Sequence, residues 1–118
     1  MPVSQEYLDY VLDQLKVVGQ VTARRMFGGA GLYLSGAFFA LVADDVLYFK
    51  VDDSNKTDYV AAGMEPFRPY GSGSYAMSYY EVPADVLEDE DQLEDWAKKS
   101  LATAVRKKSK TQKKKKRD

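Results

Sequence analysis

Residues 24–33, with the sequence RRMFGGAGLY, have the types and spacing that come nearest to a phosphate-binding loop. Closely spaced glycines let backbone amides approach an anion. A P-loop, however, needs a lysine and a hydroxyl residue after its last glycine, and then a helix. Here Gly31 is followed by Leu32-Tyr33-Leu34, which is typical of a strand. The pattern therefore predicts a bulge or tight turn between strands, where glycine permits positive φ or close backbone approach.

The two arginines of this stretch are adjacent, and in a strand they would point to opposite faces. At most one of Arg24 and Arg25 is expected to face the core side, where it would need a carboxylate or a helix C-terminus as partner. We expect one arginine to brace the fold and the other to meet a partner. A surface salt bridge is the alternative interpretation.

The carboxylates form no recognisable catalytic or metal-binding motif. Asp44-Asp45 and Asp52-Asp53 are typical of a turn and a helix cap, and residues 88–91 (EDED) of a helix start. No EF-hand spacing is present. The chain has no histidine and no cysteine, so it lacks the commonest general base, the usual zinc ligands and any thiol or disulfide chemistry. We therefore expect no catalytic residue, no metal and no cofactor.

Nine tyrosines are many for 118 residues. Tyr70, Tyr75, Tyr79 and Tyr80 surround the predicted loop 71–73 (GSG). An apolar body with a polar tip suits tyrosine to half-buried sheet faces and to interfaces. The cluster is consistent with a protein-contact surface, with stacking on nucleic-acid bases, or with ordinary sheet packing. Base stacking is disfavoured because the surrounding charge is acidic.

The charge is unevenly distributed along the chain. Residues 1–97 hold six Lys or Arg against 17 Asp or Glu, a net charge of −11, whereas residues 98–118 hold 11 against one, a net charge of +10. This asymmetry indicates a basic interaction tail, or a solubilising end that contacts nothing. The tail residues that would contact nucleic acid are Lys107, Lys108, Lys110, Lys113, Lys114, Lys115, Lys116 and Arg117.

Hydrophobic periodicity predicts a single domain of mixed helices and strands. Residues 4–18 form an amphipathic helix, capped by Ser4 and ended by Gly19. Residues 21–51 form three or four antiparallel strands in a meander, with short turns at 35–36 and 43–45. Residues 38–42 are apolar without alternation, which favours a central strand.

The second half of the chain is predicted to return to helices after a strand pair. Residues 52–63 form a short helix capped by Asp52 or Asp53, and residues 66–83 form two strands joined at 71–73. The last helix starts at Pro83, with Asp89 and Gln92 as a capping pair, and packs as far as about residue 105. Residues 1–105 are thus expected to be one α+β domain, and 106–118 a disordered basic tail.

Two segments of the sequence carry a resemblance to a known family. They are RRMFGGAGLYLSGAFFALVADDVLYFKVD and FRPYGSGSYAMSYYEVPADVLEDEDQLEDWAKKSLATA. The ordered pattern resembles the N-terminal domain of the TfoX/Sxy family. The resemblance implies a two-layer α/β sandwich of order α-β(3)-α-β(2)-α and a cytoplasmic bacterial or archaeal protein. It also implies a relation to regulators of DNA-transformation competence, which assist a transcription activator, without their C-terminal domain. It supplies no catalytic residues.

Three functions remain open at this point. The leading hypothesis is a non-enzymatic protein-interaction module, with a homodimer through an exposed sheet or tyrosine surface as one form of partnership. The alternatives are nonspecific nucleic-acid association through the tail and an enzyme that uses carboxylates, tyrosine and arginine. No apolar run reaches the roughly 20 residues of a membrane helix, and no membrane partner is expected. The predicted interaction residues are Arg24, Arg25, Phe27, Gly28, Gly29, Tyr70, Tyr79 and Tyr80.

Overall fold

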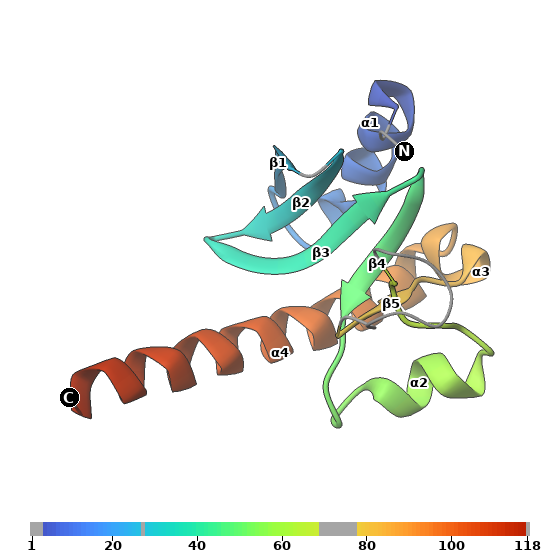
Figure 1. Cartoon of the computed structure of the whole chain (residues 1–118). Coiled ribbons are helices and arrows are strands. Elements are labelled where there is room, and N and C mark those ends of the chain that lie inside the picture. Colours follow the sequence, from blue (N-terminus) through green and yellow to red (C-terminus); the bar gives the residue numbers. More distant parts are fainter. Residues whose placement is uncertain (1–3, 27, 69–77, 118) are drawn as a thin grey trace.

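A five-stranded antiparallel sheet with helices against one face forms the domain, which confirms the α+β class (Figure 1). The computed structural model describes residues 4–26, 28–68 and 78–117, and side chains as far as Arg106. The elements are, in chain order, α1 (Gln5–Gln14), a 3₁₀ turn η1 (Leu15–Val17), β1 (Thr22–Met26), β2 (Gly29–Leu34), β3 (Ala37–Ala43), β4 (Val46–Lys50), α2 (Lys56–Ala61), β5 (Tyr79–Glu81), α3 (Ala84–Leu87) and α4 (Glu90–Arg117).

The strands follow one another across the sheet in the order β1-β2-β3-β4-β5, so the predicted meander is confirmed. Its two short turns have positive φ at both central residues: 51° and 82° at Ser35-Gly36, 53° and 57° at Asp44-Asp45. This is the geometry of a type I′ turn, whose twist matches that of the strands it joins. Asp tolerates the left-handed region better than most residues, which explains the acidic pair at the second turn.

The glycine-rich stretch lies in a hairpin and at the start of β2, as predicted, and no helix follows it. Gly28 has φ of 78° in the turn. A Cβ on Gly29 would lie 2.4 Å from the carbonyl oxygen of Val42, and one on Gly31 would lie 2.8 Å from Cε of Met26. At Gly29 the neighbouring backbone leaves no room for a Cβ, whereas at Gly31 the side chains of Met26, Phe38 and Tyr33 would have to shift.

The core fills the space between the sheet and the helices α1 and α4. Leu8 and Val11 of α1, and Leu93 and Ala97 of α4, pack with the buried strand residues, including Phe49. The prediction that the last helix packs as far as about residue 105 is confirmed by a stripe of buried side chains on α4: Leu93, Ala97, Ser100 and Ala104. Tyr59 of α2 packs edge-on against Trp96 of α4, with ring centroids 4.7 Å apart. All three of these helices are thus tied to one apolar layer.

The order of elements differs slightly from the one that the resemblance implies. Four strands precede α2, because the glycine hairpin adds β1 at the edge of the sheet. After α2, the strand pair consists of β5 and an isolated bridge between Pro66 and Tyr80. The predicted loop between them, residues 69–77, lies outside the described residues.

Three helix ends differ from the prediction. Asn55, not Asp52 or Asp53, occupies the cap position of α2, because the Asp52 carboxylate bonds instead to Ser54. The predicted helix from Pro83 onward is two helices: Pro83 precedes α3, and the Asp89 carboxylate accepts from the Gln92 amide at the start of α4. The amphipathic helix from Ser4 ends in the 3₁₀ turn η1.

Helix α4 continues to Arg117, beyond the predicted change to a disordered tail at residue 106. Residues 106–117 contain no glycine or proline, and Lys, Arg and Gln have high helix propensity, so nothing local stops the helix. Figure 1 shows this part of α4 extending past the sheet. The division into a domain of residues 1–105 and a separate tail stays a prediction.

We predict that Gly29→Ala destabilises the domain by about 2 kcal/mol, because its Cβ would meet the Val42 carbonyl and force β2 and β3 apart. Urea unfolding followed by circular dichroism measures this. Gly28→Asn is the control: Gly28 has open space around it, and Asn accepts its positive φ. A Gly29→Ala variant as stable as the control would contradict the close approach.

Candidate interaction surface

A row of three aromatic rings lies on the sheet face opposite the core. The Tyr33 and Phe38 rings stack with centroids 5.0 Å apart and an interplanar angle of 22°, and Phe38 lies 5.6 Å from Tyr79. None of the three belongs to the core cluster around Phe49. Tyr33 and Phe38 are half-buried, whereas Tyr79 is buried. We call Tyr33, Phe38 and Tyr79 the aromatic row.

A cation lies at each end of the aromatic row. The Arg24 guanidinium is 6.0 Å from the centroid of the Tyr33 ring, and Nζ of Lys50 is 4.8 Å from that of Tyr79. Such cation–π contacts are strengthened where water is excluded, and Lys50 is only 7% exposed. Burial raises the pKa of Tyr79 to about 12, so its hydroxyl stays protonated at neutral pH. Of these groups, the Tyr33 and Phe38 rings and the Arg24 guanidinium are accessible to a partner, whereas Tyr79 and Lys50 are buried.

A register shift between β2 and β3 brings the row together. The shift lies at Leu32/Tyr33, so that Tyr33 pairs with Phe38 while Leu32 pairs with Ala40. Phe39, between these two, is fully buried and packs 5.9 Å from Phe49 on the core side. Ala40 is also fully buried, so two consecutive residues of β3 enter the core. Without the shift, strict alternation would put Phe38 on the core side together with Ala40, and Phe38 could not stack on Tyr33.

Gly31 provides the space in which the row packs. A Cβ there would lie 3.1 Å from the Phe38 ring and 3.3 Å from the Tyr33 ring. The rings thus lie directly over the backbone of β2. The packing of the Phe38 and Tyr33 rings explains why residue 31 is a glycine.

The structure divides the predicted interaction residues between the two faces. Tyr79 belongs to the aromatic row and Arg24 lies over one of its rings, whereas Gly28 lies in the hairpin turn and Gly29 begins β2. Arg25 is exposed on the other side of β1, where its guanidinium donates to Oε1 of Gln5 at 2.8 Å. The two arginines therefore point to opposite faces, as predicted.

The remaining predicted residues do not join this surface. Tyr80 packs on the core side, with its ring 5.9 Å from Tyr59, so the tyrosine pair 79–80 is split by the strand. Phe27 and Tyr70 lie outside the described residues, as do the side chains of the predicted nucleic-acid tail, 107–117.

Sequence reasoning missed three members of the site, Tyr33, Phe38 and Lys50. The apolar run 38–42 shows no alternation, so the sequence does not reveal which phenylalanine leaves the core. One signal was available for Tyr33. It lies two and four residues after Gly31 and Gly29, so all three share one face of the strand, and the glycines leave space on that face for the ring. Lys50 follows an apolar strand, and only the fold shows that its side chain lies on Tyr79.

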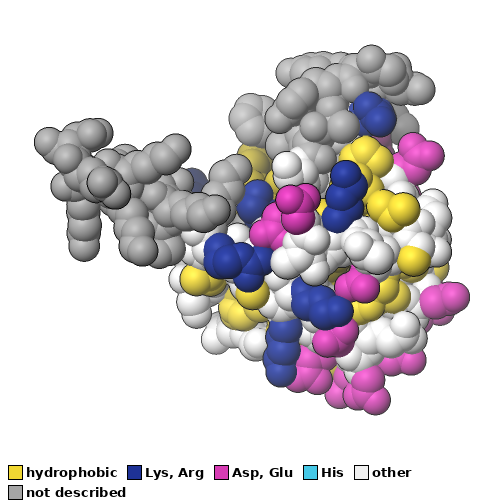
Figure 2. All heavy atoms as spheres, turned by 90° about the horizontal axis from the view of Figure 1, so that it is seen from below, with side chains coloured by type: hydrophobic (Ala, Val, Ile, Leu, Met, Phe, Trp, Pro, Cys, Tyr) yellow, Lys and Arg dark blue, Asp and Glu magenta, His cyan; other side chains and the backbone are white. Residues whose placement is uncertain are grey.

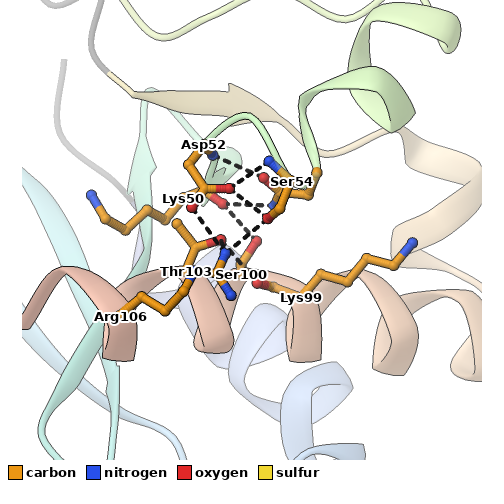
Figure 3. Close-up of polar contacts among 8 residues, drawn as sticks. Lys50, Asp52, Ser54, Lys99, Ser100, Thr103 and Arg106 are labelled. Atoms are coloured by element: carbon orange, nitrogen blue, oxygen red, sulfur yellow. Dashed lines mark hydrogen bonds and ion pairs between the residues drawn. The ribbon is translucent and has the colours of Figure 1, made fainter. Parts of the chain in front are cut away.

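A polar cluster behind Lys50 attaches α4 to the end of β4 (Figure 3). The Lys50 carbonyl oxygen accepts from Oγ of Ser100 at 2.8 Å and from Nδ2 of Asn55 at 3.1 Å. Both donors are buried, and Oδ1 of Asn55 in turn accepts from the amide of Asp52 at 2.9 Å. Figure 3 shows the Lys50 side chain pointing away from this cluster. The Lys50 backbone thus contacts the helices on the core side, while the Lys50 side chain contacts Tyr79 on the opposite face of the sheet.

The exposed part of the cluster is an ion pair. Arg106 donates to Oδ2 of Asp52 at 2.9 Å, to Oγ of Ser54 at 2.8 Å and to Oγ1 of Thr103 at 3.2 Å (Figure 3). Hydrogen bonds from Ser54, then from Arg106, lower the pKa of Asp52 to about 2. Asp52, Ser54, Asn55, Ser100 and Arg106 all hydrogen-bond within the cluster. This arrangement is typical of a contact that stabilises the fold.

Other candidate sites in the described part of the chain are weaker. An open depression of about 400 Å³ lies on α2, lined by Asp53, Lys56, Thr57, Val60 and Ala61. Among the residues that the structure describes, no three Asp or Glu side chains come together in a way that could hold a metal ion. No helix in the same residues has both the length and the apolarity to cross a membrane.

The sequence matches the profile of the TfoX N-terminal domain over residues 13–104. The chain belongs to this family. In this TfoX N-terminal domain, the match runs from the end of α1 into α4 and includes the aromatic row and most of the polar cluster. A comparison with curated proteins found no match.

We predict that Asp52→Asn destabilises this TfoX N-terminal domain by about 1 kcal/mol at pH 7, a modest value because the ion pair is partly exposed. The pKa of Asp52 in the folded state, about 2, lies below the unfolded value of about 3.9. Its contribution is therefore present above pH 4–5 and disappears as pH falls through about 2.

Thermal unfolding of both proteins at pH 7 and pH 2.5 measures this difference. Asp53→Asn, at the exposed neighbouring position, is the control and should change stability little at either pH. A destabilisation by Asp52→Asn that is equally large at pH 2.5 would show that the carboxylate charge does not stabilise the cluster.

Proposed function

We propose that this TfoX N-terminal domain is a non-enzymatic protein-interaction module that meets its partner through the aromatic row and Arg24. The observation that carries the proposal is a set of stacked rings outside the core, with a cation at each end. Tyrosine and arginine are enriched among residues that dominate binding energy at protein interfaces. Half-buried rings also lose little conformational freedom when a partner covers them.

The surrounding charge supports a protein partner over nucleic acid for this surface. Residues 1–97 carry a net charge of −11, which repels phosphate groups. In the described part of the chain, the cations that lie over rings of the row are Arg24, which is exposed, and Lys50, which is buried. An aromatic surface with an exposed arginine in an acidic body suits a protein partner that covers the rings, rather than a polyanion.

We further propose that the partner acts in transcription. This step rests on the resemblance to full-length competence regulators and not on a contact in the structure. A cytoplasmic location belongs to the same proposal. A homodimer through the row is the competing form of partnership, and the experiment below separates the two.

The test places a photo-crosslinking amino acid, p-benzoylphenylalanine, at position 33 of the full chain in its native cells. Position 33 should crosslink to a discrete protein, and Arg24→Ala should reduce that product at least tenfold, about 1.4 kcal/mol of binding energy, by removing a contact of the kind that dominates interfaces. Position 10 is the matched control, because Tyr10 is an exposed tyrosine on α1. Mass spectrometry identifies the product.

Crosslinks of equal strength from positions 33 and 10 would contradict the proposed surface. Crosslinks from position 33 to a second copy of the chain alone would replace the proposal by a homodimer. Circular dichroism confirms that the Arg24→Ala protein is folded, which is expected because Arg24 is exposed.

A second candidate function, nucleic-acid association, is favoured by the extension of α4. The described basic residues of α4 lie beside acids: Lys98 pairs with Glu94, Lys99 with Asp58 and Arg106 with Asp52. Figure 2 shows basic and acidic side chains intermingled on the face seen there. On α4, positive charge without a neighbouring acid is therefore expected from residues 107–117, which hold eight Lys or Arg.

We predict weak, sequence-independent binding of the full chain to a 20-base-pair DNA duplex. Fluorescence anisotropy should give a slope of log affinity against log salt of up to about −7, if all eight basic residues contact phosphate. Deletion of residues 107–118 should abolish binding, whereas Lys16→Gln with Lys56→Gln should not. Binding that survives the deletion would contradict this candidate.

A further inference from the structure

Arg106 lies at the junction between the packed part of α4 and its basic extension, residues 107–117. Its guanidinium is bound to the domain through one nitrogen, Nη2, which donates to Asp52, Ser54 and Thr103 (Figure 3). Nη1 and Nε have no hydrogen-bond partner among the described residues, and half of the side chain is exposed. Arg106 thus keeps donors for a ligand that approaches from solvent.

The extension continues the helix face on which Arg106 lies. Positions 110, 113 and 117 follow position 106 at intervals of four, three and four residues, and this spacing keeps them on one face of α4. All three positions hold Lys or Arg. Neighbouring positions are about 5–6 Å apart along the helix axis. A phosphate backbone that follows this face would therefore reach Arg106 next to the domain.

The bond between Asp52 and Arg106 is one that a phosphate can replace. The Asp52 side chain is 40% exposed, and ion pairs that water reaches contribute little net stability. Asp52 also accepts from the amide and the hydroxyl of Ser54, so its carboxylate keeps two hydrogen bonds when Arg106 leaves. Asp52 binds Nη2 alone, whereas a phosphate binds two guanidinium nitrogens at once. The exchange therefore gains a hydrogen bond at Arg106 and leaves no buried charge unpaired.

Building on the nucleic-acid association proposed above as the second candidate function, we infer that Arg106 belongs to the same binding surface and exchanges the Asp52 carboxylate for a phosphate group of the nucleic acid. Asp52 occupies Arg106 in the free protein and so competes with the phosphate for it. The binding surface thus continues from the extension onto the folded domain, and Asp52 sets part of its affinity.

The salt dependence of binding tests whether Arg106 contacts phosphate. Fluorescence anisotropy with the full chain and the 20-base-pair DNA duplex gives the slope of log affinity against log salt. Arg106→Gln should make this slope shallower by about 0.9, the contribution of one phosphate contact. Lys16→Gln is the control and should leave the slope unchanged, because Lys16 also pairs with an acid, Asp13, but lies on η1.

A charge-matched pair of variants tests the competition by Asp52. At a fixed salt concentration, Asp52→Asn should bind the duplex about threefold more tightly than Asp53→Asn, the size expected for release from an exposed ion pair. Both variants change the net charge equally, and Asp53 is the exposed neighbour. In an Arg106→Gln background the two variants should bind equally, because the arginine that Asp52 holds is gone. Circular dichroism at the temperature of the titration confirms that each variant is folded.

Any one of three results would overturn the inference. They are a slope that Arg106→Gln does not change, equal affinities of Asp52→Asn and Asp53→Asn, and a difference between these two that persists in the Arg106→Gln background. If binding is also lost on deletion of residues 107–118, any of these results leaves association through the extension standing and rejects the exchange at Arg106. A full chain that does not bind the duplex would reject both.

Discussion

The close contact between β2 and β3 determines which aromatic side chains enter the core and which lie on the opposite face of the sheet. Gly29 approaches the Val42 carbonyl, and the register shift at Leu32/Tyr33 inserts one extra residue into β3. Because of that residue, Phe39 enters the core while Phe38 stacks on Tyr33. A sheet in regular register would have buried a different phenylalanine, and the second aromatic surface would not form.

Lys50 connects this surface to the helical layer. Its carbonyl oxygen holds Ser100 of α4 and Asn55 at the start of α2, and its ammonium group lies on Tyr79. A buried lysine is costly unless its charge is compensated, and its aliphatic stem can cover apolar surface. The end of β4 thus contacts α4 and α2 through the Lys50 backbone and the aromatic row through the Lys50 side chain.

Local signals predicted a large part of this domain. Gly, Asp and Ser at the hairpin turns, the caps Ser4 and Asp89, and the stripe on α4 act over a few residues, so they could be read directly from the sequence. The opposite orientation of Arg24 and Arg25 followed from the two-residue period of a strand. Even the need for glycine in β2 was inferred from the strand that follows it.

The sequence by itself thus determined the elements, the meander and the absence of a phosphate loop. Only the tertiary structure decided which aromatic residues share a face. Tyr79 and Tyr80 are neighbours in the sequence, yet one lies on Lys50 and the other on Tyr59. Phe38 and Phe39 separate in the same way at the register shift. Register depends on packing across strands far apart in the chain, and no local pattern encodes that contact.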